Sequence, residues 1–350
     1  MKNIDILKLV KPVVRGLRAY EAKEIPCRVK LDANESPYPF REDLSKILAE
    51  LRTNRYPDPE AKDLKRLIAK RYGLSPQNIL LGNGSDELIY YLVTTFGGPV
   101  LYPVPTFSMY DLISRALGER GVAVPLDREF DIDIEKMLRA VKKENPKVIF
   151  LSSPNNPTGN CFSAEKIMML IERSKGIVVV DEAYQPFASE KGFLPLLRDY
   201  GNLVIMRTLS KIGFAALRLG FLLADAGIVA QVNKVRLPFN VNSLSQAIAK
   251  EALRDRRGLT ASVKTIISER DRVSGEMAGT RGVEPFPSEA NFILFRVKDP
   301  GRVYSGLLRK GVLIRNLNSG IKGCLRVTIG APKENTIFLR ALKEVMNAKG

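Results

Sequence analysis

The chain has 350 residues and contains no histidine and no tryptophan. Without histidine, nucleophiles activated by imidazole, imidazole general bases and histidine metal ligands are all excluded. An enzyme of this composition must move protons with Lys, Tyr, Asp, Glu or Cys, or must use an organic cofactor. The 55 basic and 38 acidic residues give a net charge of +17. Because the basic residues are scattered and mixed with acids, we expect attraction to small anionic ligands and no nucleic-acid partner.

Cysteine usage and hydropathy narrow the class of protein further. Cys27, Cys161 and Cys324 are far apart and form no CxxC pair, which indicates neither a disulfide framework nor a metal site. The first residues lack the uninterrupted apolar segment of a signal peptide, and no later run approaches ~18 apolar residues. We therefore expect a cytoplasmic protein with no membrane partner.

Taken in chain order, the first forty residues are rich in proline and turn signals, and we place them at a domain boundary. Short β-rich segments then alternate with amphipathic helical segments. These β-rich segments are apolar almost throughout, as is typical of strands covered on both faces. The pattern predicts an α/β domain with a mainly parallel sheet between helices and ligands at the carboxyl ends of its strands. The predicted strands begin near residues 78, 98, 147, 176, 202 and 218.

The pattern changes after residue 237. A long helical pattern covers residues 243–278. A strand candidate, a helix, two further strand candidates and a final helix follow it, which indicates a smaller α+β domain. We assign residues 41–238 to a large domain and residues 1–40 with 239–350 to a small one. The predicted strands of the small domain are 290–297, 311–316 and 324–330, and its last helix begins near residue 334.

Polar residues follow several of the apolar strands. Asp181 ends one of them, and a buried carboxylate there is costly unless it faces a cation. The alternative is that Asp181 only caps the next turn. Tyr184 follows and could lie near the same ligand. Lys211 ends the next strand beside Thr208 and Ser210, and is either an amine able to form a Schiff base or a surface lysine.

A glycine-containing turn precedes the helix that begins near Ser85, which we expect to be its N-cap. The first amides and the dipole of such a helix can bind an anion, although an ordinary capped turn is an equal alternative. The turn lacks the third glycine of a dinucleotide fingerprint and a Walker lysine, which disfavours a nucleotide-binding oxidoreductase. Asn155 and Asn156 lie in a Pro-rich turn after another strand. The glycine-containing turn, the two asparagines, Asp181 and Lys211 each lie at the end of a predicted strand. Together they predict one common site.

In this order, the motifs resemble those of the PLP-dependent aminotransferases of the aspartate-aminotransferase fold, fold type I. Within that fold they are most similar to the histidinol-phosphate aminotransferases. The set is highly specific for the fold and cofactor and less specific for the substrate. The matching segments are LDANESPYP, RYPDP, GNGSDELI, YPVPTFSMY, SSPNNPTGN, VVVDEAYQPF, TLSKIGFAALRLGF, PSEANFILFR, GVLIR and LRVTIG.

The resemblance implies pyridoxal 5'-phosphate as cofactor and assigns a role to each motif residue. Lys211 would bind the cofactor covalently and then move a proton at the substrate's α-carbon. Asp181 would pair with the pyridine nitrogen. Asn156 and Tyr184 would hydrogen-bond the ring's phenolic oxygen, and Phe107 would stack on the ring face.

The same resemblance implies a phosphate site and a dimer. The residues that would bind the cofactor phosphate are Ser85, Asp86 through its backbone amide, Ser210 and Arg218. The spacing from Lys211 to Arg218 is one residue shorter than is common in the wider fold, so we expect a tighter turn. Tyr56 would reach the phosphate from the neighbouring subunit, which implies a homodimer with shared active sites.

Three further residues bear on the substrate. Arg326 matches the arginine that binds an α-carboxylate in ordinary aminotransferases, and Arg315 and Tyr20 fit the positions that would bind a substrate phosphate. The alternatives are surface arginines and a packing tyrosine. We predict amino transfer from L-histidinol phosphate to 2-oxoglutarate, giving imidazole-acetol phosphate and L-glutamate, in histidine biosynthesis. The alternatives are an aromatic-amino-acid aminotransferase and a threonine-phosphate decarboxylase.

Overall fold

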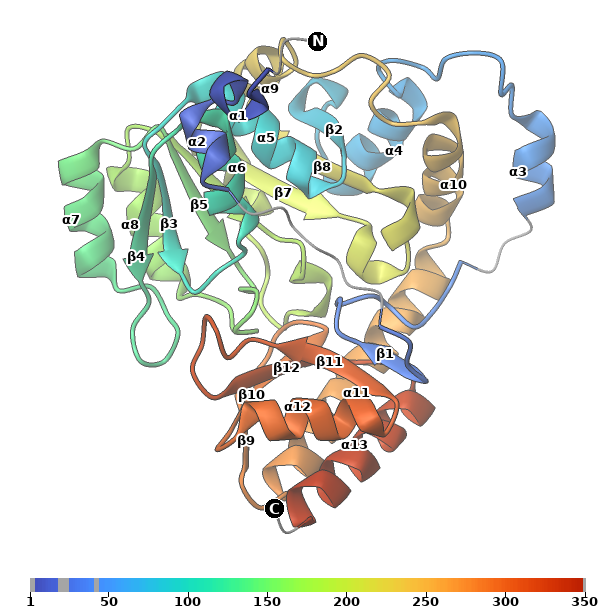
Figure 1. Ribbon diagram of the computed structural model, residues 1–350. Helices are drawn as coiled ribbons and strands as arrows, with labels where there is room; N and C mark the ends of the chain where they lie inside the picture. Colours follow the sequence, from blue (N-terminus) through green and yellow to red (C-terminus); the bar gives the residue numbers. More distant parts are fainter. Residues whose placement is uncertain (1–3, 18–24, 41–43, 349–350) are drawn as a thin grey trace.

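A computed structural model describes residues 4–17, 25–40 and 44–348 of the chain. Two sheets organise this part of the chain, and Figure 1 shows the larger sheet above the smaller one. The larger sheet has seven strands in the order β2-β8-β7-β6-β5-β3-β4. Their bounds are Ile79–Asn83 (β2), Val100–Val104 (β3), Gly121–Pro125 (β4), Val148–Ser152 (β5), Ile177–Asp181 (β6), Leu203–Thr208 (β7) and Leu219–Ala224 (β8).

Five strands of the larger sheet, β3 to β7, are parallel, whereas β8 runs antiparallel to both β2 and β7. The prediction of a mainly parallel mixed sheet is therefore confirmed. Each of the six predicted strands corresponds to an observed one, but β4 was missed. The reason is that β4 lies at the sheet edge, where only Val124 is buried, so it lacks the continuous apolar run of the central strands.

Apolar side chains alternate between the two faces of this sheet, as the period of a strand requires. Ile149 and Leu151 of β5 join one buried cluster, and Val148 and Phe150 join the cluster on the opposite face. Helices cover both clusters, so both faces of the sheet are shielded from solvent. Residues of α4 (Lys62–Tyr72), α7 (Ile134–Glu144), α8 (Ala164–Arg173) and α10 (Ser243–Arg254) belong to the first cluster, and residues of α5 (Ser85–Phe96), α6 (Met109–Leu117) and α9 (Ala226–Val232) belong to the second.

The smaller sheet has five strands in the order β1-β11-β12-β10-β9. β1 is parallel to β11, and the other pairs are antiparallel. Two of its strands were not predicted, because β1 and β9 have only three residues each. The bounds are Val29–Leu31 (β1), Val283–Pro285 (β9), Phe292–Val297 (β10), Val312–Asn316 (β11) and Cys324–Thr328 (β12), with α11 (Arg256–Ala278), α12 (Pro300–Arg309) and α13 (Pro332–Asn347) packed on the sheet.

The long helix predicted over residues 243–278 is wrong as a single element. The helix ends after Arg254, and a new one begins after Asp255, whose carboxylate accepts a hydrogen bond from the backbone of Gly258. Aspartate is a strong N-cap residue, which explains the break. α10 packs into the core of the larger sheet, whereas much of α11 packs into the core of the smaller one. The predicted division into domains stays a prediction.

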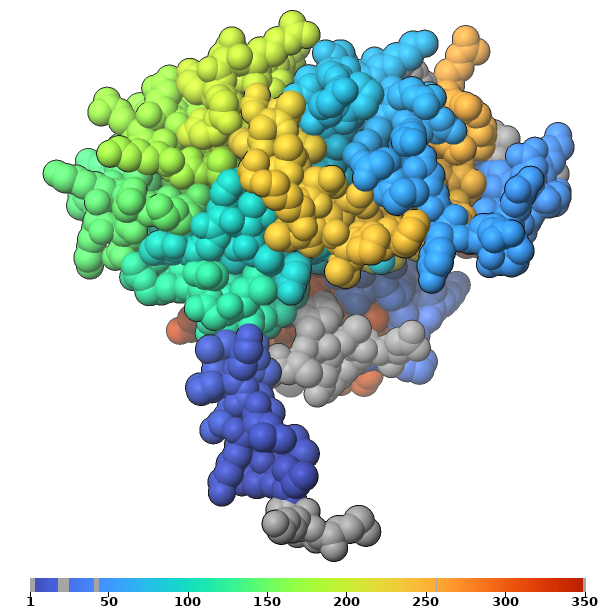
Figure 2. Space-filling view, turned by 90° about the horizontal axis from the view of Figure 1, so that it is seen from above, coloured from blue at the N-terminus to red at the C-terminus, as the bar shows by residue number. Residues whose placement is uncertain are grey.

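One side chain connects the two cores, and the first helices lie at the surface. Ile212, which follows the candidate lysine, packs against the apolar clusters of both sheets. At the other extreme, α1 (Ile6–Leu9) and α2 (Pro12–Arg15) project from the body, as Figure 2 shows in dark blue, and no residue of either helix is buried. α3 (Leu44–Glu50) contacts α10. No helix of the described ranges is long and apolar enough to cross a membrane.

Candidate active site

Asp181 lies at the carboxyl end of β6 in the centre of the larger sheet and is 3% exposed. The phenol of Tyr110 donates to its Oδ2 at 2.7 Å, and the amide of Ala183 donates to its Oδ1 at 3.1 Å. Burial raises the pKa of this carboxyl to about 6, although these hydrogen bonds and the Lys211 ammonium oppose the shift. A cation beside this buried carboxyl would therefore stabilise its anionic form.

Lys211 lies in the turn η4 (Ser210–Ile212) directly after β7. Its Nζ is 5.8 Å from the centroid of the Tyr184 ring, so the lysine faces the buried tyrosine. The turn ends at Gly213, whose φ of 112° suits glycine, and a Cβ there would lie 2.8 Å from the carbonyl oxygen of Tyr38. The Lys211 ammonium also acts on the carboxyl of Asp181, so the two residues lie in the same region.

The start of α5 lies beside this region. The prediction of Ser85 as N-cap is wrong, since the N-cap is Gly84 and Ser85 is the first helical residue. Gly84 has a φ of 85° and a ψ of 167°, a conformation that side chains rarely adopt, so the chain enters the helix at this glycine. No side chain caps α5, which leaves its first amides to an anion.

Arg218 lies over the same helix start. A Cβ placed on Gly84 would be 2.7 Å from Arg218 Nη2, and that nitrogen is 3.4 Å from Asp86 Oδ2. Two successive 3₁₀ turns, η4 and η5 (Ala215–Leu217), connect Lys211 to Arg218, and such turns are tighter than α-helix, as the short spacing predicted. The hydroxyl of Ser210 is 3.0 Å from Thr208 Oγ1 at the base of this corner.

Arg326 joins the two sheets at the site. It lies on β12 of the smaller sheet, and its guanidinium donates to Asn156 Oδ1 and, at 2.8 Å, to the carbonyl of Asp32. Its Cζ is 5.1 Å from the centroid of the Phe292 ring. Arg315 on β11 is directly opposite Arg326 in the strand register, so the two arginines share one face of the smaller sheet.

The aromatic candidates have different positions. Phe107 is half-buried, and its ring meets the ring of Tyr110 edge to face at 5.6 Å, which places it next to the partner of Asp181. Tyr56 is 81% exposed and stacks on Phe239 at 4.6 Å, outside the cluster around Lys211. Tyr20 lies outside the described residues.

Two residues of this site were missed from the sequence. Tyr110 donates to Asp181, and Asn34 donates to the hydroxyl of Tyr184 at 2.8 Å. Both lie inside segments that carried the resemblance, YPVPTFSMY and LDANESPYP. Nothing in their local pattern distinguishes them from packing residues, because their partners are 71 and 150 positions away.

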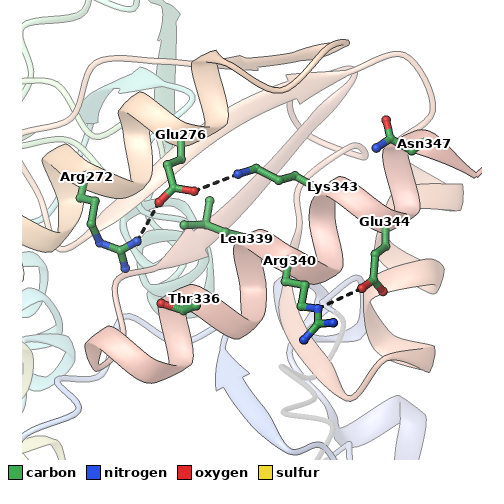
Figure 3. A pocket seen from close by; sticks show the side chains of 8 residues that line it. All are labelled: Arg272, Glu276, Thr336, Leu339, Arg340, Lys343, Glu344 and Asn347. Atoms are coloured by element: carbon green, nitrogen blue, oxygen red, sulfur yellow. Dashed lines mark hydrogen bonds and ion pairs between the residues drawn. The ribbon is translucent and has the colours of Figure 1, made fainter.

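A surface hollow lies elsewhere, between α11 and α13. It has a volume of about 360 Å³, and Figure 3 shows its charged side chains paired with one another. Glu276 pairs with Arg272 and Lys343, and Arg340 pairs with Glu344. These internal pairs leave no indication of a ligand in the hollow.

Known proteins match this sequence and this fold. A family model described as aminotransferase class I and II matches residues 22–342. The chain is 46% identical over 343 residues to the histidinol-phosphate aminotransferase of Aquifex aeolicus, across 95% of this chain and 96% of the relative. The structure of the Sinorhizobium meliloti histidinol-phosphate aminotransferase in complex with pyridoxal-5'-phosphate has a TM-score of 0.87 and 27% identity, over 96% of this chain and 97% of that one.

An aspartate aminotransferase mutant from Thermus thermophilus has a TM-score of 0.81 at 18% identity, over 96% of this chain and 99% of that one. At this identity the likeness shows the fold alone, which is the aspartate-aminotransferase fold that the sequence predicted. The chain therefore belongs to the class I and II aminotransferases and, within them, to the family of the histidinol-phosphate aminotransferases.

Proposed function

We propose that this protein is a PLP-dependent enzyme of histidine biosynthesis. It transfers the amino group of L-histidinol phosphate to 2-oxoglutarate and yields imidazole-acetol phosphate and L-glutamate. The observation that carries the proposal is that the Lys211 amine faces the ring of Tyr184 and acts on the buried Asp181 carboxyl. The name of the Aquifex aeolicus relative and the cofactor of the Sinorhizobium meliloti structure support it.

The residues present fit pyridoxal 5'-phosphate. The Asp181 carboxyl, with its pKa raised by burial to about 6, is stabilised by a cation, and the protonated ring nitrogen of the cofactor is one. The uncapped start of α5 and the Arg218 guanidinium fit its phosphate. The amine of Lys211 fits its aldehyde. When bound, the cofactor supplies a ring that withdraws electrons from the substrate's α-carbon.

Each residue around the ring then has a task. Lys211 would hold the cofactor through its amine and would carry the proton at the substrate's carbon. Asp181 keeps the ring nitrogen protonated. Asn156 accepts from Arg326 with its oxygen, which leaves its amide nitrogen to donate to the ring oxygen. Tyr184 would donate to the same oxygen, and Phe107 would stack on the ring and exclude water.

The phosphate end uses the start of α5. The amides of Ser85 and Asp86, the hydroxyl of Ser210 and the guanidinium of Arg218 bind the phosphate oxygens. The Asp86 carboxylate now lies 3.4 Å from Arg218, and a phosphate dianion competes with it for that cation. Asp86 therefore contributes its amide and turns its carboxylate away.

The substrate is selected on the smaller sheet. Arg326 binds the α-carboxylate of glutamate, and Arg315 on the same face adds the second cation that the phosphate of histidinol phosphate needs. Arg315 is exposed, so its side chain can turn towards either substrate. Tyr20 completes this pocket in the proposal.

We place the enzyme in the cytoplasm as a homodimer with shared sites. Tyr56 and Phe239 stack on the surface, and Leu237 beside them along the chain is 62% exposed. Exposed apolar side chains that gather at one place are suited to a contact with another protein. In the proposal a second copy covers it, and Tyr56 reaches the cofactor phosphate of that copy.

Absorption and substrate preference test the activity together. The protein purified with pyridoxal 5'-phosphate should absorb visible light, and Lys211→Ala should lose both this absorption and all amino transfer. Histidinol phosphate should be a donor at least tenfold better than phenylalanine. Equal use of the two donors, or release of carbon dioxide from phosphothreonine, would contradict the substrate, and a colourless protein would contradict the cofactor.

Hybrid dimers test the shared site. Lys211→Ala and Tyr56→Ala chains, each poorly active alone, are unfolded together and refolded with the cofactor. Shared sites predict that the mixture regains activity, because one site of each hybrid dimer is intact. No recovery in a mixture that sediments as a dimer would contradict the role of Tyr56.

A further inference from the structure

A buried hydrogen-bond network lies behind the candidate site and is centred on Asn34. Asn34 is 1% exposed and has a φ of 56°, a left-handed conformation that asparagine tolerates better than most residues. Its side chain joins Tyr184 of the larger part of the molecule to Thr328 on β12 of the smaller sheet. Its carbonyl also accepts from Asn291 at 3.0 Å. Asn34 thus lies where the two parts meet.

The hydrogen bonds of this network form a chain that begins at one backbone amide. The amide of Asn34 can only donate, and it donates to Thr328 Oγ1 at 2.9 Å. The hydroxyl of Thr328 has one proton, and this proton goes to Asn34 Oδ1 at 3.1 Å. In this arrangement the side-chain oxygen of Asn34 accepts from Thr328, and its nitrogen donates on the other side.

The same logic extends to Tyr184. Asn34 Nδ2 donates to the Tyr184 hydroxyl at 2.8 Å, so the phenolic oxygen accepts on that side. The phenol's own proton must then point elsewhere. Tyr184 is 4% exposed, and Lys211 Nζ lies 5.8 Å from its ring centroid, so the ring borders the candidate site and its hydroxyl proton can be donated there.

We propose that Asn34 is a positioning residue that fixes the direction of the Tyr184 hydroxyl proton, so that Tyr184 donates to the ring oxygen of the cofactor. The inference rests on the proposed function, because it names the residue that orients a donor of that site. Asn34 itself does not touch the reacting atoms. Since Thr328 belongs to the smaller sheet, the proton of Tyr184 is held by both parts of the molecule.

The test measures how the visible absorption of the cofactor-loaded protein changes with pH. A hydrogen bond to the ring oxygen stabilises the form in which that oxygen is negatively charged. Loss of the donor destabilises this form, so the pH midpoint of the absorption change should rise. Asn34→Asp replaces the donor by an acceptor and should raise the midpoint by about one pH unit, the size of one hydrogen bond to a charged oxygen. Asn34→Ala should shift it in the same direction.

A double-mutant cycle separates positioning from a structural effect. Tyr184→Phe alone should raise the midpoint, and adding Asn34→Ala to it should change the midpoint no further. The control is Asn335→Ala, which removes another asparagine with 1% exposure and three hydrogen bonds to Gly330 and Glu269. It should lower the melting temperature without moving the midpoint. Equal shifts by Asn34→Ala with and without Tyr184 would overturn the proposal.

A second pair of variants keeps the test decisive if no Asn34 variant folds. Thr328→Val removes the hydroxyl that fixes the Asn34 amide and should raise the midpoint, whereas Thr328→Ser keeps the hydroxyl and should not. An unchanged midpoint in Thr328→Val would overturn the inference. A wild-type protein with no visible absorption would instead contradict the proposed function, so the two failures are distinguishable.

Discussion

At the scale of single residues, Asp181 is the acid most sensitive to its surroundings. The groups around it are the Tyr110 phenol, the Ala183 amide, the Asp86 carboxylate and the Lys211 ammonium. The hydrogen bonds and the ammonium favour the anion, while burial and Asp86 favour the neutral acid. Burial has the largest effect, which explains the raised pKa.

This balance predicts a pH dependence of stability in the protein without cofactor. Because the pKa of Asp181 is about 6 when folded and 3.8 ordinarily, the folded state holds the proton more tightly between these values. Stability from this site is complete below pH ~4 and is lost as the pH rises through ~6, by about 3 kcal/mol in all. Asp181→Asn should lack this loss. The measurement is urea unfolding of both proteins from pH 4 to 8, and parallel curves would contradict it.

Arg315 carries a prediction about specificity. Arg315→Ala removes one of two cations on the same face and should raise the KM for histidinol phosphate about tenfold, since a charged hydrogen bond contributes ~1.5–3 kcal/mol. The KM for glutamate, which Arg326 binds, should change less than threefold. Arg309→Ala, an exposed arginine of α12, is the control and should change neither value. Equal effects on both substrates would indicate a general electrostatic role.

At the scale of elements, the start of α5 depends on one glycine. Gly84→Ala forces a side chain into the φ of 85° and places a Cβ 2.7 Å from Arg218. The backbone strain costs about 1–3 kcal/mol, and the displaced guanidinium should weaken cofactor binding at least tenfold. Gly73→Ala is the matched control, because Gly73 also has a positive φ, of 67°, but meets nothing within 4 Å. It should lose stability without losing cofactor affinity, as titration calorimetry can measure.

The elements also show where prediction from the sequence succeeded and where it could not. The central strands were predicted because each is a continuous apolar run, and Asp181 and Lys211 stood out because each follows such a run. β1 and β9 are too short to show a period, and Asp255 breaks a helix whose pattern continues across it. Tyr110 and Asn34 act through partners far away in the chain, which no local pattern encodes.

At the scale of the whole molecule, the excess of basic residues attracts the substrates. A net charge of +17 produces a positive field over the surface, and both the donor and 2-oxoglutarate are anions. We expect kcat/KM for histidinol phosphate to fall several-fold between 0.02 and 0.3 M salt, as screening shortens the Debye length from about 20 Å to about 6 Å. Stopped-flow kinetics at several salt concentrations checks this. A value of kcat/KM that does not change with salt would contradict electrostatic attraction of the substrate.

The position of Ile212 has a mechanical consequence. This side chain packs against the cores of both sheets and is joined by one peptide bond to Lys211. A close-packed interior does not deform smoothly, so a rotation of the smaller sheet on the larger one must repack Ile212. Because Ile212 and Lys211 share the turn η4, such a rotation would also change the position of the Lys211 amine. One aliphatic side chain therefore links the packing of the two sheets to the position of the nucleophile.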